Sequence, residues 1–173
     1  MSQLTAASAA QGHVAEKPRL MKTPFATCIG NALEWFDIAI YGFFASYIAH
    51  AYFPTADPTV SLLLAFGSFG VSFLIRPLGA IVLGAYADKH GRKASLLLSI
   101  SLMMIGGLII VVTPSYATLG MAAPLLILAA RLIQGFSAGG EFGSSTAFLV
   151  EHFPERKALI ASWQVATQGA STL

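Results

Sequence analysis

Long runs of apolar residues dominate this sequence and limit what it can fold into. Four complete runs and part of a fifth approach or exceed the roughly 20 residues that an α-helix needs to cross a bilayer. They cover residues 24–49, 60–86, 94–113, 121–150 and 158–173. Only 10% of the residues are charged, whereas about 25% are charged in an ordinary soluble domain. We therefore expect an all-α, polytopic membrane helical bundle with four complete transmembrane helices and a truncated fifth.

The positions of the basic residues predict how these helices are oriented. Apart from Arg76 and Arg131, all Lys and Arg residues lie in three segments: residues 1–22, 88–93 and 151–157. The other two connections, residues 50–58 and 113–120, contain none. The positive-inside rule places the basic segments in the cytoplasm. Residues 1–22 are thus predicted to be a flexible cytoplasmic tail, and residues 23–173 the transmembrane bundle.

The first apolar run carries two carboxylates, Glu34 and Asp37, although the rest of the run suits lipid. With residues placed 100° apart around a helix, Thr27, Asn31 and Tyr41 share an arc of about 120° with them. Such a stripe is typical of a helix with one face toward lipid and one toward a polar interior. Neighbouring carboxylates disfavour joint ionisation, which predicts a proton-carrying pair. The alternative is that they only hydrogen-bond adjacent helices or pair with an arginine.

Two arginines, Arg76 and Arg131, also lie inside apolar runs. Arginine does not lose its proton in a protein, so each one needs a carboxylate, a water-filled cavity or an anionic ligand. Glu34, Asp37 and Glu141 are the acidic residues predicted at membrane depth. Paired charges can account for most of this set. The sequence therefore leaves open whether either arginine contacts a substrate or is only paired structurally.

The fourth run contains Gly135, Gly139 and Gly143, spaced four residues apart. This pattern lets another helix approach closely, so we predict a helix-packing role for the three glycines. The same run contains GFSAG, which matches the nucleophile motif of hydrolases. That motif needs a strand, a sharp turn and a nearby histidine, and the four histidines lie in the tail and the loops. An intramembrane enzyme is therefore the weaker hypothesis.

Composition argues against several other classes. The net charge of +2 is too small and too dispersed to indicate nucleic-acid binding. Cys28 is the only cysteine, so the chain has no internal disulfide and no thiolate cluster for a metal. We expect no metal and no other cofactor.

The connection GAYADKHGRK, residues 84–93, places an acid at a helix C-terminus and two cations at the start of the next helix. This is the reverse of what the helix dipole favours, so we expect a group elsewhere to satisfy Asp88. The spacing resembles the signature loop of the major facilitator superfamily, where the acid meets a helix of the protein's other half. The resemblance rests on Gly84, Asp88, Lys89, Gly91, Arg92 and Lys93, and it implies a conformational-gate loop.

Further stretches narrow the resemblance. Arg131, Gln134 and Gly135 are similar to the superfamily's R-x-x-Q-G motif, whose arginine is associated with proton coupling. GNALEWFD, FLIRPLGAIVLGAYADKHGRK and RLIQGFSAGGEFG resemble the metabolite:proton symporter family, which takes up citrate, 2-oxoglutarate, shikimate, or proline and betaine. That family implies twelve helices in two similar halves that move solute by alternating access around a midplane site. This chain is then expected to be an N-terminal fragment whose partner is the missing C-terminal half.

The resemblance leads to a functional hypothesis: proton-coupled symport of a small organic acid, citrate or another di- or tricarboxylate, across the bacterial inner membrane. The expected partners are the organic anion, the proton and the lipid bilayer. The expected substrate-binding residues are Arg76, Arg131, Asn31, Tyr41 and Gln134. The expected proton-coupling residues are Glu34, Asp37, Arg131 and Glu141. The alternatives are symport of a zwitterion such as proline or betaine, and a non-transporting membrane fragment or assembly partner.

Overall fold

The computed structural model describes residues 22–152 and 157–171. The predicted tail lies outside the described residues, except for Lys22. In the described part of the chain every regular element is a helix and none is a strand, which confirms the all-α fold. The helices are α1 (Lys22–Phe43), α2 (Ala45–Tyr52), α3 (Pro58–His90), α4 (Arg92–Val112), α5 (Tyr116–Leu119), α6 (Ala122–His152) and α7 (Lys157–Ser171).

The apolar run at residues 24–49 gives two helices, because α1 and α2 meet at Phe44. This residue has φ −95° and ψ 9°, outside the usual helical values. Helical hydrogen bonds nevertheless bridge it. Its N–H donates to the Ile40 carbonyl and its carbonyl accepts from the Ile48 N–H, each at 2.9 Å. The chain thus continues past the break without a loop.

Local chemistry sets the ends of the longest helix, α3. The Asp57 side chain accepts a hydrogen bond from the Thr59 N–H at 2.8 Å, and Pro58 follows Asp57 at the helix start. At the other end, Gly91 has φ +89°, a conformation that residues with a side chain rarely adopt. Glycine at this position therefore separates α3 from α4. The single turn α5 lies within residues 113–120, which the sequence pattern indicated only as a loop.

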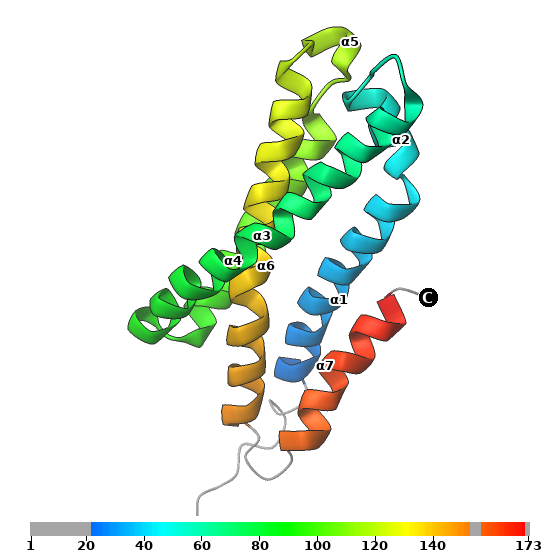
Figure 1. The fold of residues 1–173 in the computed structure, drawn as a ribbon. Coiled ribbons are helices and arrows are strands. Elements are labelled where there is room, and N and C mark those ends of the chain that lie inside the picture. The colour runs from blue at the N-terminus through cyan, green and yellow to red at the C-terminus, as the bar shows by residue number, and fades with distance from the viewer. Residues whose placement is uncertain (1–21, 153–156, 172–173) are drawn as a thin grey trace, which may run out of the picture.

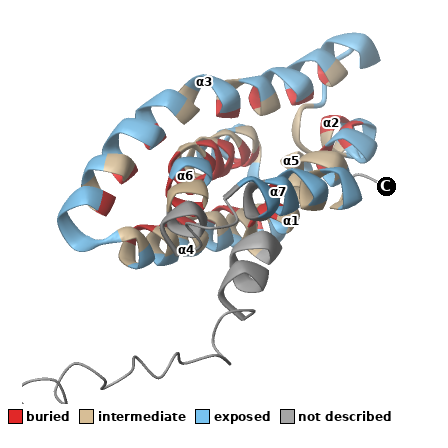
Figure 2. Cartoon of the chain, turned by 90° about the horizontal axis from the view of Figure 1, so that it is seen from below, coloured by how far each residue is buried: buried red, intermediate tan, exposed pale blue. Residues whose placement is uncertain are grey.

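Helix α6 lies at the centre of the bundle. Figure 1 shows α3 and α4 packed along α6, while α1 lies beside α7. Seen from below, α3 passes around α6 with its buried residues turned inward (Figure 2). The short helices α2 and α5 lie together at one end of the bundle, next to the two connections without basic residues. The end of α6 and the start of α7 lie at the opposite end.

Small and polar side chains form the interior, and large apolar side chains cover the outside. On α6 alone, the buried polar residues include Arg131, Gln134, Ser137, Glu141, Ser144 and Ser145. In contrast, Leu74 on α3 and Val111 on α4 are 80% and 82% exposed. This arrangement suits a protein whose surroundings are lipid. By length and composition, three helices among the described residues can cross a membrane: Pro58–His90, Arg92–Val112 and Ala122–Ala147.

Helices α3 and α6 cross so closely that the crossing requires glycine. An added Cβ at each of three glycines would overlap the backbone of the facing helix: Gly79 against Phe136, Gly135 against Ser72, and Gly139 against Arg76. Gly140 is also confined, because its Cβ would meet the Leu83 side chain. A Cβ at Gly143 would meet nothing within 4 Å. The close contact therefore includes Gly135 and Gly139 but does not extend to Gly143 among the described residues.

We predict that Gly139→Ala lowers the free energy of unfolding by about 1–3 kcal/mol, because the added methyl group forces α3 away from α6. Gly143→Ala is the matched control, one turn further along the same helix. Alanine is favoured over glycine in a helix by about 1 kcal/mol, so the control should keep or slightly raise the stability. Thermal unfolding in detergent, followed by circular dichroism, compares the two. Equal midpoints for both variants would contradict the close crossing.

Candidate functional site

Two ion pairs connect α1 to the neighbouring helices. The Arg76 Nη2 atom on α3 donates to the Glu34 Oε1 atom at 2.9 Å, and the Arg131 Nη1 atom on α6 donates to the Asp37 Oδ2 atom at 2.8 Å. Glu34 and Asp37 are three residues apart on α1 and therefore lie on one face of that helix. Four of the charged residues that the sequence places at membrane depth thus form two ion pairs.

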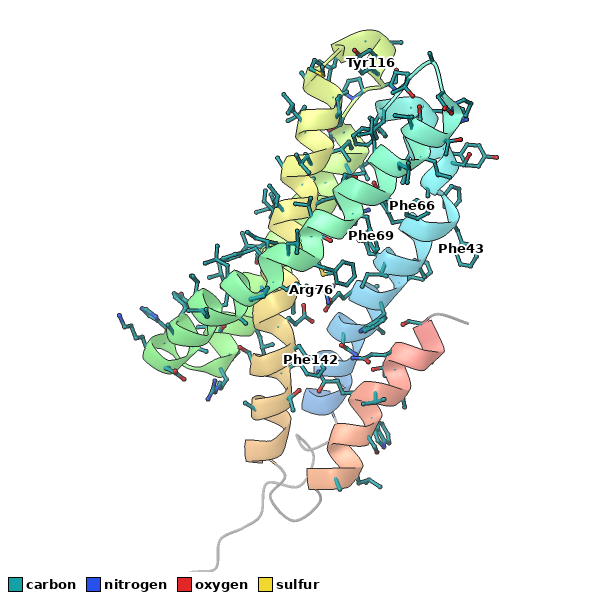
Figure 3. The ribbon with its side chains drawn as sticks, viewed as in Figure 1. Phe43, Phe66, Phe69, Arg76, Tyr116 and Phe142 are labelled. Atoms are coloured by element: carbon teal, nitrogen blue, oxygen red, sulfur yellow. The ribbon has the colours of Figure 1, made fainter. Side chains whose placement is uncertain are left out.

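Both pairs line one small cavity between α1, α3, α4 and α6. Its polar lining includes Glu34, Asp37, Arg76, Arg131 and Gln134, all of which the sequence predicted as site residues. The cavity has a volume of about 20 Å³, which is room for about one water molecule. Figure 3 shows Arg76 and Phe69 on the side of α3 that faces α1. The described side chains therefore fill most of the space between the ion pairs.

The cavity also contains residues that the sequence analysis missed. Phe69 and Ser72 on α3 and Met103 on α4 form part of its wall. Ser72 and Phe69 lie four and seven residues before Arg76, so they share its helical face. That spacing is the signal that could have identified them. Met103 carries no comparable signal, because only the packing of α4 against α6 places it near the charges.

The two arginines are held differently. The Arg131 side chain is 5% exposed, and its Nη1 atom donates to the Gln134 Oε1 atom at 2.8 Å as well as to Asp37. The Arg76 side chain is 27% exposed and donates to Glu34. In both arginines the Nε atom is buried without a hydrogen-bond partner among the described residues. Each guanidinium group therefore retains an unused donor.

Tyr41, expected to bind substrate, does not line the cavity. Its side chain is buried, and its hydroxyl donates to the Ala65 carbonyl at 3.1 Å. The same hydroxyl shares a hydrogen bond with the Ser68 hydroxyl at 2.8 Å. Both partners belong to α3, so the phenol joins α1 to α3 instead of pointing a free donor at a ligand.

Asn31, also expected to bind substrate, contacts α7. Its Nδ2 atom donates to the Gln164 carbonyl at 3.0 Å and to the Thr167 hydroxyl at 3.3 Å. Its Oδ1 atom accepts from the Gln168 Nε2 atom at 3.4 Å. The Gln164 side chain in turn bonds to Ser145 and Thr146 on α6, at 2.7 and 2.9 Å. These amides and hydroxyls join α1, α6 and α7 without using charge.

Glu141 on α6 is a further buried acid besides Glu34, and it lies outside the cavity lining. Its Oε1 atom lies so close to α1 that a Cβ on Gly30 would approach it to 2.8 Å. Its Oε2 atom is buried without a hydrogen-bond partner among the described residues. Glu141 therefore differs from Glu34 and Asp37, each of which is bonded to an arginine.

The gate loop predicted from the sequence lies away from the cavity, at the junction of α3 and α4 (Figure 1). Arg92 and Asp88 form an ion pair across this junction, with 3.6 Å between Nη1 and Oδ1. Asp88, Lys89 and Lys93 are exposed, and a Cβ on Gly84 would meet nothing within 4 Å. Arg92 is thus an ion-pair partner of Asp88 among the described residues, and the partner expected for Asp88 in another part of the protein stays a prediction.

The hydrolase-like motif, the polar stripe and metal binding are the remaining points that the sequence raises. The GFSAG serine, Ser137, lies in the middle of α6, where its buried hydroxyl donates to the Ser99 carbonyl. The side chain of Thr27, a member of the predicted polar stripe, lies outside the described residues. Within the described ranges, no group of three His, Cys, Asp or Glu residues is placed to hold a metal ion.

Comparisons with known proteins identify a family and several relatives of this chain. A family described as sugar (and other) transporter matches residues 23–171. A citrate-proton symporter of Klebsiella pneumoniae is 51% identical over 80% of this chain and 32% of its own length. An alpha-ketoglutarate permease of Escherichia coli is 48% identical, also over 80% and 32%. A proline/betaine transporter of Salmonella typhimurium is 44% identical over 84% of this chain and 29% of its own length. The chain thus spans about a third of the length of these relatives. No solved structure matches.

We predict that Asp37→Asn destabilises the protein more than Glu34→Gln. Each change removes a charge and keeps an oxygen acceptor, but Asp37→Asn leaves Arg131 unpaired, and that side chain is more deeply buried than Arg76. Breaking a fully buried pair on one side costs about 3–5 kcal/mol, and we expect a smaller loss here because the Asp37 side chain is 35% exposed. Adding Arg131→Gln to Asp37→Asn should recover part of the loss. Thermal unfolding in detergent measures all three variants, and equal effects of the two single changes would contradict the difference in burial.

Proposed function

Because the chain belongs to the sugar (and other) transporter family, within the major facilitator superfamily, we propose that it forms part of a proton-coupled symporter for small organic anions. Citrate or another di- or tricarboxylate is the proposed substrate. The relatives named citrate-proton symporter and alpha-ketoglutarate permease support this substrate class. The sequence resemblance to the superfamily is confirmed by the family match.

The observation that carries the proposal is the pair of arginines in one cavity, each bound to an acid of α1. A substrate carboxylate forms the same kind of charge-assisted hydrogen bond with a guanidinium group as Glu34 or Asp37 does. A dicarboxylate can therefore displace both acids. Each displaced acid becomes an uncompensated charge at membrane depth unless it takes up a proton. Anion binding and proton binding are thus coupled, and the coupling is reciprocal.

The size of the cavity adds a conformational step to this proposal. A volume of about 20 Å³ is far below the several hundred Å³ that are typical of pockets for organic ligands. Substrate binding therefore requires α1 to move away from α3 and α6. The two ion pairs cross those boundaries, so displacing their carboxylates loosens the helices that must separate. This is the behaviour that alternating access demands.

The other site residues take supporting roles in the proposal. Gln134 holds the Arg131 Nη1 atom and lines the cavity, so it orients the arginine toward the substrate. Glu141 lies next to α1 without an arginine partner and serves as a further proton acceptor. Tyr41 and Asn31 hold α1 against α3 and α7, and we assign them to positioning α1 instead of contacting the substrate.

The three apolar helices make the chain a membrane protein. We place it in the bacterial inner membrane with the N-terminus in the cytoplasm, because the basic connection at residues 88–93 then faces inward. The α3–α4 junction would accordingly serve as the cytoplasmic gate loop.

A zwitterion is the second candidate substrate. Relatives named proline/betaine transporter are 43–44% identical to the chain. A zwitterion would place its carboxylate on one arginine and its ammonium group near the acid that the arginine released. It would displace one acid, whereas a dicarboxylate displaces two.

We predict that an inward proton gradient drives uptake of citrate or 2-oxoglutarate more than uptake of betaine, in proteoliposomes of the complete gene product. Replacing Arg76 and Arg131 together by Ala should lower kcat/KM for the preferred anion by about 100-fold or more, because two charge-assisted contacts are lost. Gel filtration of both proteins controls for folding. Unchanged uptake by the double variant would refute the substrate role of the arginines.

Asp37→Asn should separate transport from proton coupling. Asparagine cannot take up a proton, so we predict that proton-driven accumulation of the anion is lost. Exchange of labelled for unlabelled substrate across the membrane needs no net proton movement and should persist. Glu34→Gln should behave in the same way. Accumulation that keeps its normal dependence on external pH in both variants would show that these acids do not carry the coupled protons.

A further inference from the structure

The two cavity arginines share a feature that the ion pairs do not explain: each guanidinium group lies over an aromatic ring. We propose that Tyr41, Phe69 and Phe73 form an aromatic platform that keeps Arg76 and Arg131 in place while their carboxylate partners are exchanged for substrate. Tyr41 and Phe73 are accordingly positioning residues for anion binding. This inference rests on the proposed function and adds residues to it that the sequence did not indicate in this role.

The contact at Arg131 is the closer of the two. Its guanidinium carbon lies 3.8 Å from the centroid of the Tyr41 ring. The ring itself cannot swing away freely, because its hydroxyl is bonded to Ala65 and Ser68 on α3. The Tyr41 side chain is 1% exposed. Arg131 on α6 therefore rests on a ring from α1 that is fixed by α3.

The contact at Arg76 follows the same pattern. Its guanidinium carbon lies 4.4 Å from the centroid of the Phe73 ring. Phe69 joins the two contacts, because its ring stacks on Tyr41 at 5.2 Å with an interplanar angle of 13°. It also meets Phe73 edge to face at 5.2 Å. The three rings thus form one continuous row, with an arginine over each end.

Geometry divides each guanidinium group into two parts. The guanidinium carbon lies over the ring, and we infer that the ring covers the flat face, where a planar cation is attracted by the π-electrons. The N–H donors lie along the edge, and this edge makes the bond to the carboxylate. Exchange of one carboxylate for another therefore changes the edge contacts and leaves the face contact intact.

This division gives the rings a role in affinity. Without the ring, the long arginine side chain would regain its rotamer freedom when Glu34 or Asp37 dissociates from it. The substrate would then have to order that side chain again. A guanidinium group that remains on its ring is already oriented for the incoming anion, which is a form of preorganisation. Loss of a ring should therefore raise KM and leave the maximal rate nearly unchanged.

The test compares two phenylalanines of α3. Phe73→Leu removes the ring under Arg76, while Phe66→Leu removes a ring about two turns earlier on the same helix. The exposures of the two side chains are nearly equal, 43% for Phe73 and 45% for Phe66. Among the described residues, Phe66 makes no ring or guanidinium contact. Comparing the two variants thus separates the effect of losing the cation contact from the effect of losing any aromatic side chain that faces lipid.

Anion uptake by the complete gene product in proteoliposomes is the first measurement. We expect Phe73→Leu to raise KM by about 3- to 30-fold, the range of a cation–π contact, with kcat changed less than twofold. Phe73→Trp should restore KM, and Phe66→Leu should keep it at the wild-type value. Equal KM values for Phe73→Leu and Phe66→Leu would overturn the proposal, as would a failure of Phe73→Trp to restore KM.

A second pair of variants covers the case in which Phe73→Leu does not fold. Tyr41→Phe keeps the ring under Arg131 and removes only the hydroxyl, whereas Tyr41→Leu removes the ring. The platform predicts that KM rises more in Tyr41→Leu than in Tyr41→Phe. The same KM in both would show that the hydroxyl, and not the ring, is what matters, and would overturn the proposal.

Labelling of Arg76 by phenylglyoxal, followed by mass spectrometry, gives a readout that does not depend on transport. Removing the ring exposes the guanidinium face, so Phe73→Leu should be labelled faster than wild type and Phe66→Leu should not. If the wild-type protein takes up no organic anion but this difference in labelling is found, the proposed function fails and the platform stands. Equal labelling of all three proteins overturns the platform.

Discussion

The backbone contact between α3 and α6 positions both arginines of the cavity. Gly79, Gly135 and Gly139 allow the two helices to touch without side chains between them. The carbonyl that Gly139 faces belongs to Arg76 itself, so the crossing point and the charged residue are the same place on α3. Arg131 lies two turns before Gly139 on α6. The helices that carry the two arginines are therefore held together by a contact that involves no charge at all.

Helix α1 is attached by a different kind of interaction. No comparable glycine contact joins α1 to α3 among the described residues. Among the described residues, its links to α3 and α6 include the two ion pairs and the hydroxyl and ring of Tyr41, and its link to α7 includes the amide group of Asn31. Polar contacts such as these can be exchanged for a ligand, a proton or water, whereas interlocked backbones cannot. The structure thus combines a tightly packed pair of helices, α3 and α6, with a helix, α1, whose polar contacts can be exchanged.

The sequence predicted the membrane helices and the charges of the site because both have strong one-dimensional signals. Apolar runs identify the helices, and Arg76, Arg131, Glu34 and Asp37 stand out against them. It did not predict which acid pairs with which arginine, since pairing depends on the rotation and height of α1 against its neighbours. For the same reason Asn31 and Tyr41 were expected in the cavity with the rest of the polar stripe. The stripe is wide enough to face α7, the cavity and α3 at once, and helical angle alone does not divide it.

The two ion pairs are not equivalent, and their difference bears on the order of events in the proposed symport. Arg131 is almost fully buried, lies over Tyr41 and holds Gln134 in addition to Asp37. Arg76 is more exposed and holds only Glu34 by hydrogen bond. Glu34 therefore has fewer competing restraints on its partner, and it lies near Glu141, an acid without an arginine. In the proposed cycle the substrate meets Arg76 first, because that arginine is the more exposed of the two, and the release of Glu34 loosens α1 before the pair of Asp37 and Arg131 is exchanged.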